Sequence, residues 1–215
     1  RLTRITPLSK YEYYIIHQNS PDNRGIDVAM LYHPDMFIPI ESIFIPVTGL
    51  NYDDDPTRDI LFVKGVLKSQ DTVCIFVNHW PSRYGGQIAT RHKRLSAATV
   101  LRHRIDSLFK GESASKIIVM GDFNDEPWDE SISEILEVEI PGDEIIQNHL
   151  YSLIPPLKKS ISGTLKFEGR WYLFDHFIVS GGLLNALSFY ETVIISHDFL
   201  LEPDEAYTGQ KPFRT

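Results

Sequence analysis

"KIIVMGDFND", residues 116–125, joins a run of aliphatic residues to a cluster of polar ones. A short apolar run that ends at a glycine is typical of a buried strand, so a β-strand is predicted over 116–121. Asp122 and Asn124 follow directly. A carboxylate beside such a strand is costly unless it is paired or holds a cation. The stretch is therefore a chemical site or a turn, because Gly, Asp and Asn also favour turns.

The rest of the chain contains more short β-type runs and one long helical pattern. Apolar residues spaced three or four apart predict a helix over 87–109. A short helix is predicted over 130–137. Further strands are predicted at 12–17, 25–32, 42–47, 59–67, 72–80, 172–180 and 188–196. This order favours an α+β sandwich with mixed sheets over a regular βαβ alternation, and the absence of a linker favours one domain over 1–215.

Composition excludes several classes of protein. The chain has 215 residues, of which 42% are hydrophobic and 23% charged, as expected for a folded domain. A net charge of −8 argues against a broad non-specific nucleic-acid surface, although short or single-stranded substrates remain open. The single cysteine excludes a disulfide framework, and no apolar run is long enough to cross a membrane. The compartment stays undetermined. The basic run 91–94 is interpreted as a solvated helix face.

Polar residues gather where predicted strands begin or end. His79 lies at the end of the strand 72–80, just after the apolar run "VCIFV", and Asp22 and Arg24 precede the strand 25–32. In "YLFDHFIVS", alternation places Asp175 with Leu173 on a face predicted to be buried. Each residue alone has an ordinary explanation: His79 is typical of a structural histidine, and Asp175 could pair with a backbone amide. As a set, these side chains are rich in oxygen.

An oxygen-rich set suits a hard cation such as Mg²⁺ (or Mn²⁺), whereas no spaced cysteines or histidines argue for zinc. Cleavage of a phosphate ester needs these parts: a cation to neutralise the phosphate, a carboxylate to orient or deprotonate water, and donors for the transition-state oxygens. The sequence therefore predicts a metal-dependent phosphoester hydrolase.

Several motifs resemble the endonuclease/exonuclease/phosphatase superfamily, which has the pancreatic-deoxyribonuclease fold. They are "VMGDFND", "VNHWPSRYGG" and "YLFDHFIVS", with weaker likeness in "DNRGIDVAMLY" and "TRDILFVKGVL". The resemblance implies a four-layer α/β/β/α sandwich of two mixed β-sheets flanked by helices. It also implies phosphoester hydrolysis that depends on a divalent cation.

The resemblance also implies a role for each matching residue. Asp122 would bind the metal and activate or orient the attacking water. Asn124 would hold a phosphate oxygen, and His79 would donate a hydrogen bond to the scissile phosphate. Asp175 would support the site through a histidine or the metal, and Arg24 would contact a phosphate oxygen.

The two ends of the chain depart from the family pattern. Members begin with a strand that precedes a metal-ligating Glu, and the opening "RLTRITPLSKYEYY" resembles the stretch just after that Glu. Members end on a Ser-Asp-His turn, whereas "SHDFL" (196–200) has these residue types in another order and is interpreted as an ordinary strand end. The expectation is an incomplete domain. A phosphodiesterase or nuclease is favoured, with a phosphomonoesterase, a lipid- or inositol-phosphate hydrolase and a non-catalytic phosphate-binding domain left open.

Overall fold

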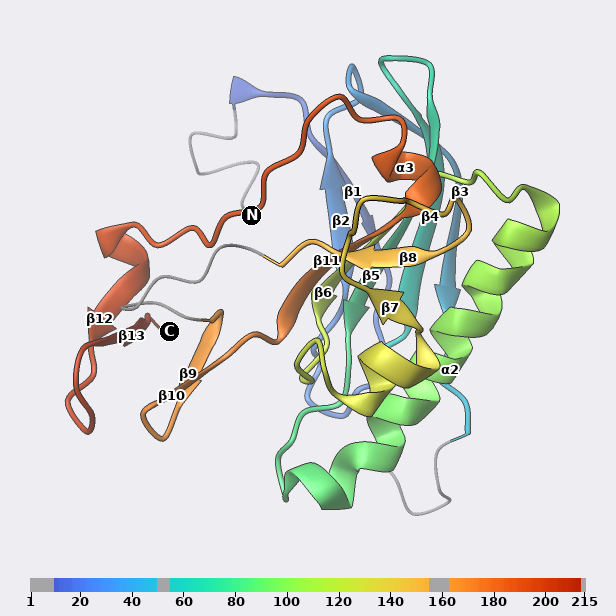
Figure 1. Cartoon of the computed structure of the whole chain (residues 1–215). Coiled ribbons are helices and arrows are strands. Elements are labelled where there is room, and N and C mark those ends of the chain that lie inside the picture. The colour runs from blue at the N-terminus through green and yellow to red at the C-terminus, as the bar shows by residue number, and fades with distance from the viewer. Residues whose placement is uncertain (1–9, 50–54, 155–162, 214–215) are drawn as a thin grey trace.

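The computed structural model describes residues 10–49, 55–154 and 163–213, which centre on a seven-stranded mixed sheet (Figure 1). The strand order is β3-β4-β5-β6-β11-β8-β7. The strands are β3 (Phe37–Ile45), β4 (Ile60–Leu67), β5 (Thr72–His79), β6 (Ile117–Asp122), β7 (Val138–Glu139), β8 (Leu150–Ser152) and β11 (Asp175–Ser180). The predicted α+β sandwich is confirmed.

The centre of the sheet brings three strand ends to one edge. β5 and β6 are parallel, and the helix α2 (Gln87–Gly111) makes the crossover between them. Their carboxyl ends therefore lie at the same edge of the sheet. β11 pairs with β6 in the antiparallel sense, so its first residue lies at this edge too.

Helix α2 covers one face of the sheet (Figure 1). Its apolar side packs on the strands together with the short π-helix η2 (Ser131–Ile135). The side chains between these layers are fully buried, among them Phe62, Phe76, Leu101, Ile105, Ile117 and Val119. A close-packed apolar layer of this kind holds the central strands in fixed register.

The other face carries smaller elements. The ribbon of β1 (Tyr14–His17) and β2 (Ala29–Tyr32) packs over the half of the sheet that contains β4 and β5. Towards β11 lie the helix α3 (Gly181–Leu184), the hairpin of β9 (Leu165–Phe167) and β10 (Arg170–Tyr172), the 3₁₀ turn η3 (Asp198–Leu200), and the hairpin of β12 (Leu201–Pro203) and β13 (Gln210–Pro212). A buried pair of Lys166 and Asp204, 2.8 Å apart, joins the two hairpins.

Most predicted elements are confirmed, and the errors have physical causes. β3 begins at Phe37 rather than residue 42, because an edge strand with a bulge after Pro39 accepts a proline. The predicted strand 188–196 is wrong: β-type residues form a strand only where a neighbour pairs with them, and no ladder includes this segment. "SHDFL" leads into η3 instead of ending a strand. The opening residues 1–9 lie outside the described part of the chain.

No helix in the described ranges is long and apolar enough to cross a membrane.

Candidate active site

His79, Asp122 and Asp175 form a row across three neighbouring strands. His79 of β5 lies directly opposite Asp122 of β6, and Asp122 lies directly opposite Asp175 of β11. Directly opposite residues project from the same face of a sheet, and this face is the one that α2 does not cover. The structure therefore brings together three residues that are up to 96 positions apart, from 79 to 175, in the sequence.

The loop after β6 is both a turn and part of this site. Gly121 has φ +132°, and a Cβ there would lie 1.9 Å from the carbonyl oxygen of Asn78, so only glycine fits. Asn124 has φ 52°, a conformation that asparagine accepts more readily than most residues. Its backbone N–H donates to Asp122 Oδ1 over 2.8 Å, which closes an Asx turn. The two explanations of "GDFN" are therefore compatible.

The Asp122 carboxylate lies in an unfavourable place for a negative charge. Its pKa is raised to about 6, mainly by burial and also by the nearby charge of Asp175, although the N–H of Asn124 and the charge of Arg58 act in the opposite direction. No three or more His, Cys, Asp or Glu side chains of the described residues enclose a metal-sized space. Mg²⁺ commonly uses only one or two carboxylates and completes its shell with water and substrate oxygens. Asp122 and Asp175 fit that pattern, because a cation would offset their mutual repulsion.

His79 is held as a neutral imidazole. Its pKa is lowered to about 4, mainly by burial and also by the positive charges of Arg58 and Arg24. Its Nε2 is 3.8 Å from Asp122 Oδ2, which is too long for a hydrogen bond. A neutral imidazole keeps one N–H donor. His79 can therefore donate to a bound anion without carrying a charge of its own.

Arg24 presents a fixed but accessible guanidinium. Its Nε and Nη2 both donate to the carboxylate of Asp22, and its side chain is 55% exposed. Burial alone would raise the pKa of Asp22, but hydrogen bonds from Arg24 and Arg58 outweigh that effect and hold it well below the usual range. Because the charge of Arg24 also acts on His79, the predicted phosphate contact lies near the row.

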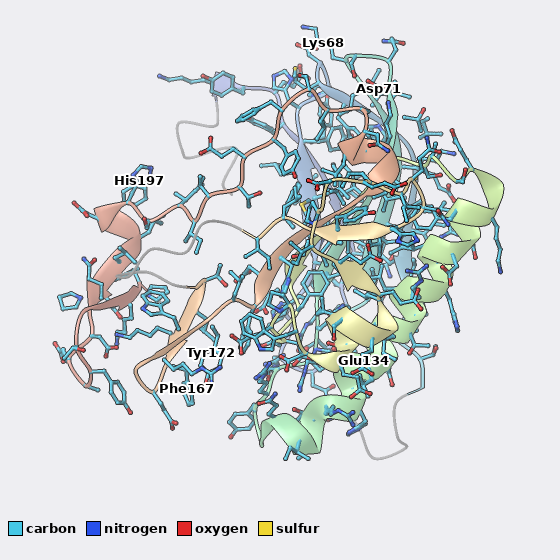
Figure 2. The ribbon with its side chains drawn as sticks, in the orientation of Figure 1. Lys68, Asp71, Glu134, Phe167, Tyr172 and His197 are labelled. Atoms are coloured by element: carbon cyan, nitrogen blue, oxygen red, sulfur yellow. The ribbon has the colours of Figure 1, made fainter. Side chains whose placement is uncertain are left out.

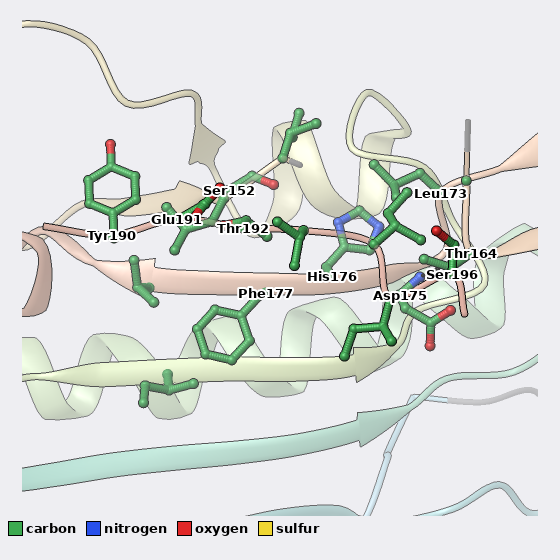
Figure 3. A pocket seen from close by; sticks show the side chains of 18 of the residues that line it. Ser152, Thr164, Leu173, Asp175, His176, Phe177, Tyr190, Glu191, Thr192 and Ser196 are labelled. Carbon is green, nitrogen blue, oxygen red and sulfur yellow. Dashed lines mark hydrogen bonds between the residues drawn. The ribbon is translucent and has the colours of Figure 1, made fainter. Parts of the chain in front are cut away.

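The prediction that Asp175 is buried is wrong. The strand predicted over 172–180 is interrupted at 173–174, and β11 begins at Asp175 itself. His176 is the residue that faces α2: it is buried, and its Nε2–H donates to the carbonyl oxygen of Asp125 over 2.8 Å. Asp175 is exposed and, with Phe177, borders a largely apolar cavity of about 930 Å³ (Figure 3).

The sequence predicted no role for the two arginines that hold the Asn124 loop. Arg94 is 1% exposed, and its Nε donates to Asp125 Oδ1 over 2.7 Å, so the run 91–94 is not simply a solvated face. Arg83 donates from Nε to the carbonyl oxygen of Asn124 over 2.7 Å. A signal was present, because Arg94 precedes Ala98 by one helical turn on the apolar stripe of α2.

Arginines and aromatic rings also join the β9–β10 hairpin to this loop. The guanidinium of Arg83 lies 6.0 Å from the ring centre of Tyr172 in β10 and 4.5 Å from that of Phe174, which follows the hairpin. Tyr172 marks this hairpin in Figure 2. Such contacts add to the ion pair between Arg170 and Glu126, 3.2 Å apart, and fix the hairpin beside the row.

Solved structures of the same fold come from several organisms. The catalytic domain of human Nocturnin with bound sulfate is 21% identical, with a TM-score of 0.57 over 80% of this chain and 62% of that one. The mannosyl-6-phosphatase Bt3783 of Bacteroides thetaiotaomicron is 16% identical, with a TM-score of 0.58 over 83% and 65%. Truncated Caenorhabditis elegans TDP2 is 16% identical, with a TM-score of 0.57 over 84% and 66%. At this level of identity the likeness concerns the fold.

This chain thus spans between 62% and 66% of the length of those three structures. Among curated proteins, no sequence matches it significantly. The model of the Endonuclease/Exonuclease/phosphatase family matches residues 1–215. The chain belongs to the endonuclease/exonuclease/phosphatase family.

Proposed function

We propose that the protein is a divalent-metal-dependent phosphoester hydrolase of the phosphodiesterase or nuclease type. The observation that carries the proposal is the row of His79, Asp122 and Asp175 on one face of the sheet. Asn124 follows Asp122 within one turn, so a donor for a phosphate oxygen stands beside the carboxylates. Structural packing alone gives no reason to place two carboxylates opposite each other.

Each residue has a role that its surroundings support. Asp122 has one oxygen in the Asx turn, and the other is available to orient or deprotonate water. Neutral His79 donates its N–H to the scissile phosphate. The amide nitrogen of Asn124 carries two hydrogens, of which the bond to the carbonyl oxygen of Trp80 uses one, so the second can reach a phosphate oxygen. Arg24 supplies an exposed positive charge for the same anion.

Mg²⁺ or Mn²⁺, held by Asp122 next to Asp175, would neutralise the phosphate and its leaving oxygen. The acidic surface, with a net charge of −8, favours small or single-stranded substrates over long duplexes. The names of the similar structures include a mannosyl-6-phosphatase, so a phosphomonoester is the second candidate. A lipid or inositol phosphate, or non-catalytic phosphate binding, would also use this site.

The test is hydrolysis of bis-p-nitrophenyl phosphate and p-nitrophenyl phosphate by the full-length protein with Mg²⁺ or Mn²⁺, and with EDTA. We expect EDTA to abolish hydrolysis. We expect Asp122→Asn and His79→Ala each to lower kcat/KM about a hundredfold, since one lost transition-state contact costs about 3 kcal/mol. The matched control is His197→Ala, because His197 lies on the C-terminal segment beside η3, away from the sheet (Figure 2). A rate within threefold of wild type in both site variants would refute the roles.

A further inference from the structure

Arg58 lies beneath the candidate site; it belongs to the stretch "TRDILFVKGVL", but the sequence predicted no role for it. Its side chain is 1% exposed, and its guanidinium donates three hydrogen bonds in three directions. Nε donates to the carbonyl oxygen of His79 over 3.0 Å, and Nη2 donates to that of Trp80 over 2.6 Å. Nη1 donates to Asp22 Oδ2 over 2.5 Å.

The carbonyl oxygen of Trp80 is shared. It accepts from Arg58 Nη2 and also from the side-chain Nδ2 of Asn124, over 3.0 Å. One acceptor thus joins the end of β5 to the loop that follows β6. The guanidinium of Arg58 therefore fixes the backbone at His79 through one bond. Through another it fixes the carbonyl group of Trp80, which in turn orients the amide of Asn124.

Asp22 anchors this arrangement. Its carboxylate is 5% exposed and receives bonds from Arg58 and from Arg24. A buried guanidinium needs such a partner, because an unpaired buried charge is strongly destabilising. The same carboxylate therefore sets the direction of Arg24, the predicted phosphate contact, and of Arg58. Hydrogen bonds connect Arg24, Asp22, Arg58 and Trp80 to Asn124 without a gap.

We propose that Arg58, with Asp22 as its anchor, is a positioning residue that holds His79 and Asn124 in the arrangement the reaction needs. The proposal rests on the proposed phosphoester hydrolysis at this site. Arg58 touches no substrate, because its guanidinium is buried and directed at protein acceptors. Lysine cannot replace it: a single ammonium does not offer the planar fork of donors that reaches three separate acceptors.

The first measurement compares Arg58→Lys with wild type in the full-length protein. We expect kcat towards bis-p-nitrophenyl phosphate to fall at least tenfold while KM changes less than threefold, since binding groups remain but their alignment is lost. The matched control is Arg102→Lys. Arg102 is 18% exposed, pairs with Asp106 and donates to the carbonyl oxygen of Leu136, away from the row. It should keep kcat within twofold.

The second measurement does not depend on activity. NMR signals of the His79 ring, the Asn124 side-chain amide and the Trp80 indole N–H report the local geometry. They should move in Arg58→Lys and stay in Arg102→Lys. If wild type hydrolyses no phosphoester, the proposed function fails, and these signals alone decide the positioning role. If Arg58→Lys does not fold, Asp22→Asn is measured instead, with the same expected loss of kcat and shift of signals.

Unchanged His79 and Asn124 signals in the folded variant would overturn the proposal. So would a lower melting temperature with wild-type kcat, because that result describes a purely structural residue.

Discussion

The two faces of the seven-stranded sheet are built in different ways. On the α2 side, Phe62, Phe76, Ile117 and Val119 are all 0% exposed and meet the apolar side of the helix. On the other side, near β11, Phe177 is 40% exposed, and the side chains border the cavity of about 930 Å³ instead of a packed layer. Charged and polar groups, including the row, lie on this second face.

The difference shows how one sheet serves two purposes. The packed face fixes strand positions through contacts that do not depend on charge. Near β11 the open face can then carry carboxylates in unfavourable surroundings, because the central strands are already held by the packed layer under α2. Features that break the ordinary rules of packing are expected at functional sites.

The largest expected loss of stability comes from removing Asp22 from its ion pair with Arg58. Asp22→Ala leaves the buried guanidinium of Arg58 without its carboxylate partner, so we expect the free energy of unfolding at pH 7 to fall by about 3–5 kcal/mol. The pKa of Asp22 is depressed in the folded state. Its stabilising contribution is therefore complete above the ordinary carboxyl pKa, about 4, and is lost as the pH falls below it. Urea unfolding at pH 7, 5 and 3 measures this loss.

The difference between wild type and Asp22→Ala should shrink from pH 5 to pH 3. An equal difference at pH 7 and pH 3 would show that the ion pair is not what stabilises this region.

On the packed face, the loss of stability caused by removing an apolar side chain should not depend on pH. Leu101→Ala removes a fully buried side chain from α2, and we expect a loss of about 2–5 kcal/mol at every pH. Phe177→Ala is its counterpart on the open face and should cost about 1 kcal/mol or less, because the ring is partly in water already. Thermal and urea unfolding of both variants would sharpen the contrast. Similar losses of stability in the two variants would contradict the proposed difference between the two faces.

The smallest expected change is an increase in the free energy of unfolding. In metal-free protein the folded state raises the pKa of Asp122 to about 6, so between about pH 4 and 6 the folded carboxyl holds its proton more tightly than the unfolded one. Stability therefore falls as the pH rises through this window. Asp122→Asn lacks the penalty and should be more stable at pH 7, by no more than about 1 kcal/mol because water screens the half-exposed group.

Melting curves in EDTA at pH 4.5 and pH 7 measure this gain. A variant less stable than wild type at pH 7 would contradict the account of Asp122.

Local patterns predicted much of this molecule, because strands and helices have distinct periods. The strand before Gly121 follows from its apolar spacing, and so does the helix, predicted over 87–109 and observed as Gln87–Gly111. Ile88, an apolar residue in the first turn of α2, does not follow this pattern: it is 88% exposed, whereas the charged Arg94, six residues later, is buried. Periodicity identifies a stripe of residues, and only tertiary contacts show where the stripe ends.

The candidate site shows the same limit. Residue type marked His79, Asp122, Asn124 and Arg24, because these groups are out of place next to apolar runs. The burial of Asp175 was wrong, because the break at 173–174 reversed the face that meets the core. Arg58 was missed, because its partners at 22, 79 and 80 are distant in the sequence and two of them are backbone carbonyls. Every residue has a backbone carbonyl, so the residue type does not show which carbonyl accepts a hydrogen bond.

The row across β5, β6 and β11 also makes the length of β6 critical. Side chains alternate between faces along a strand, so a deletion of one residue from β6 would turn Asp122 towards α2. Evolution or design can exchange one aliphatic residue for another within β6, whereas an insertion or deletion of a single residue there would separate the carboxylate from both of its neighbours.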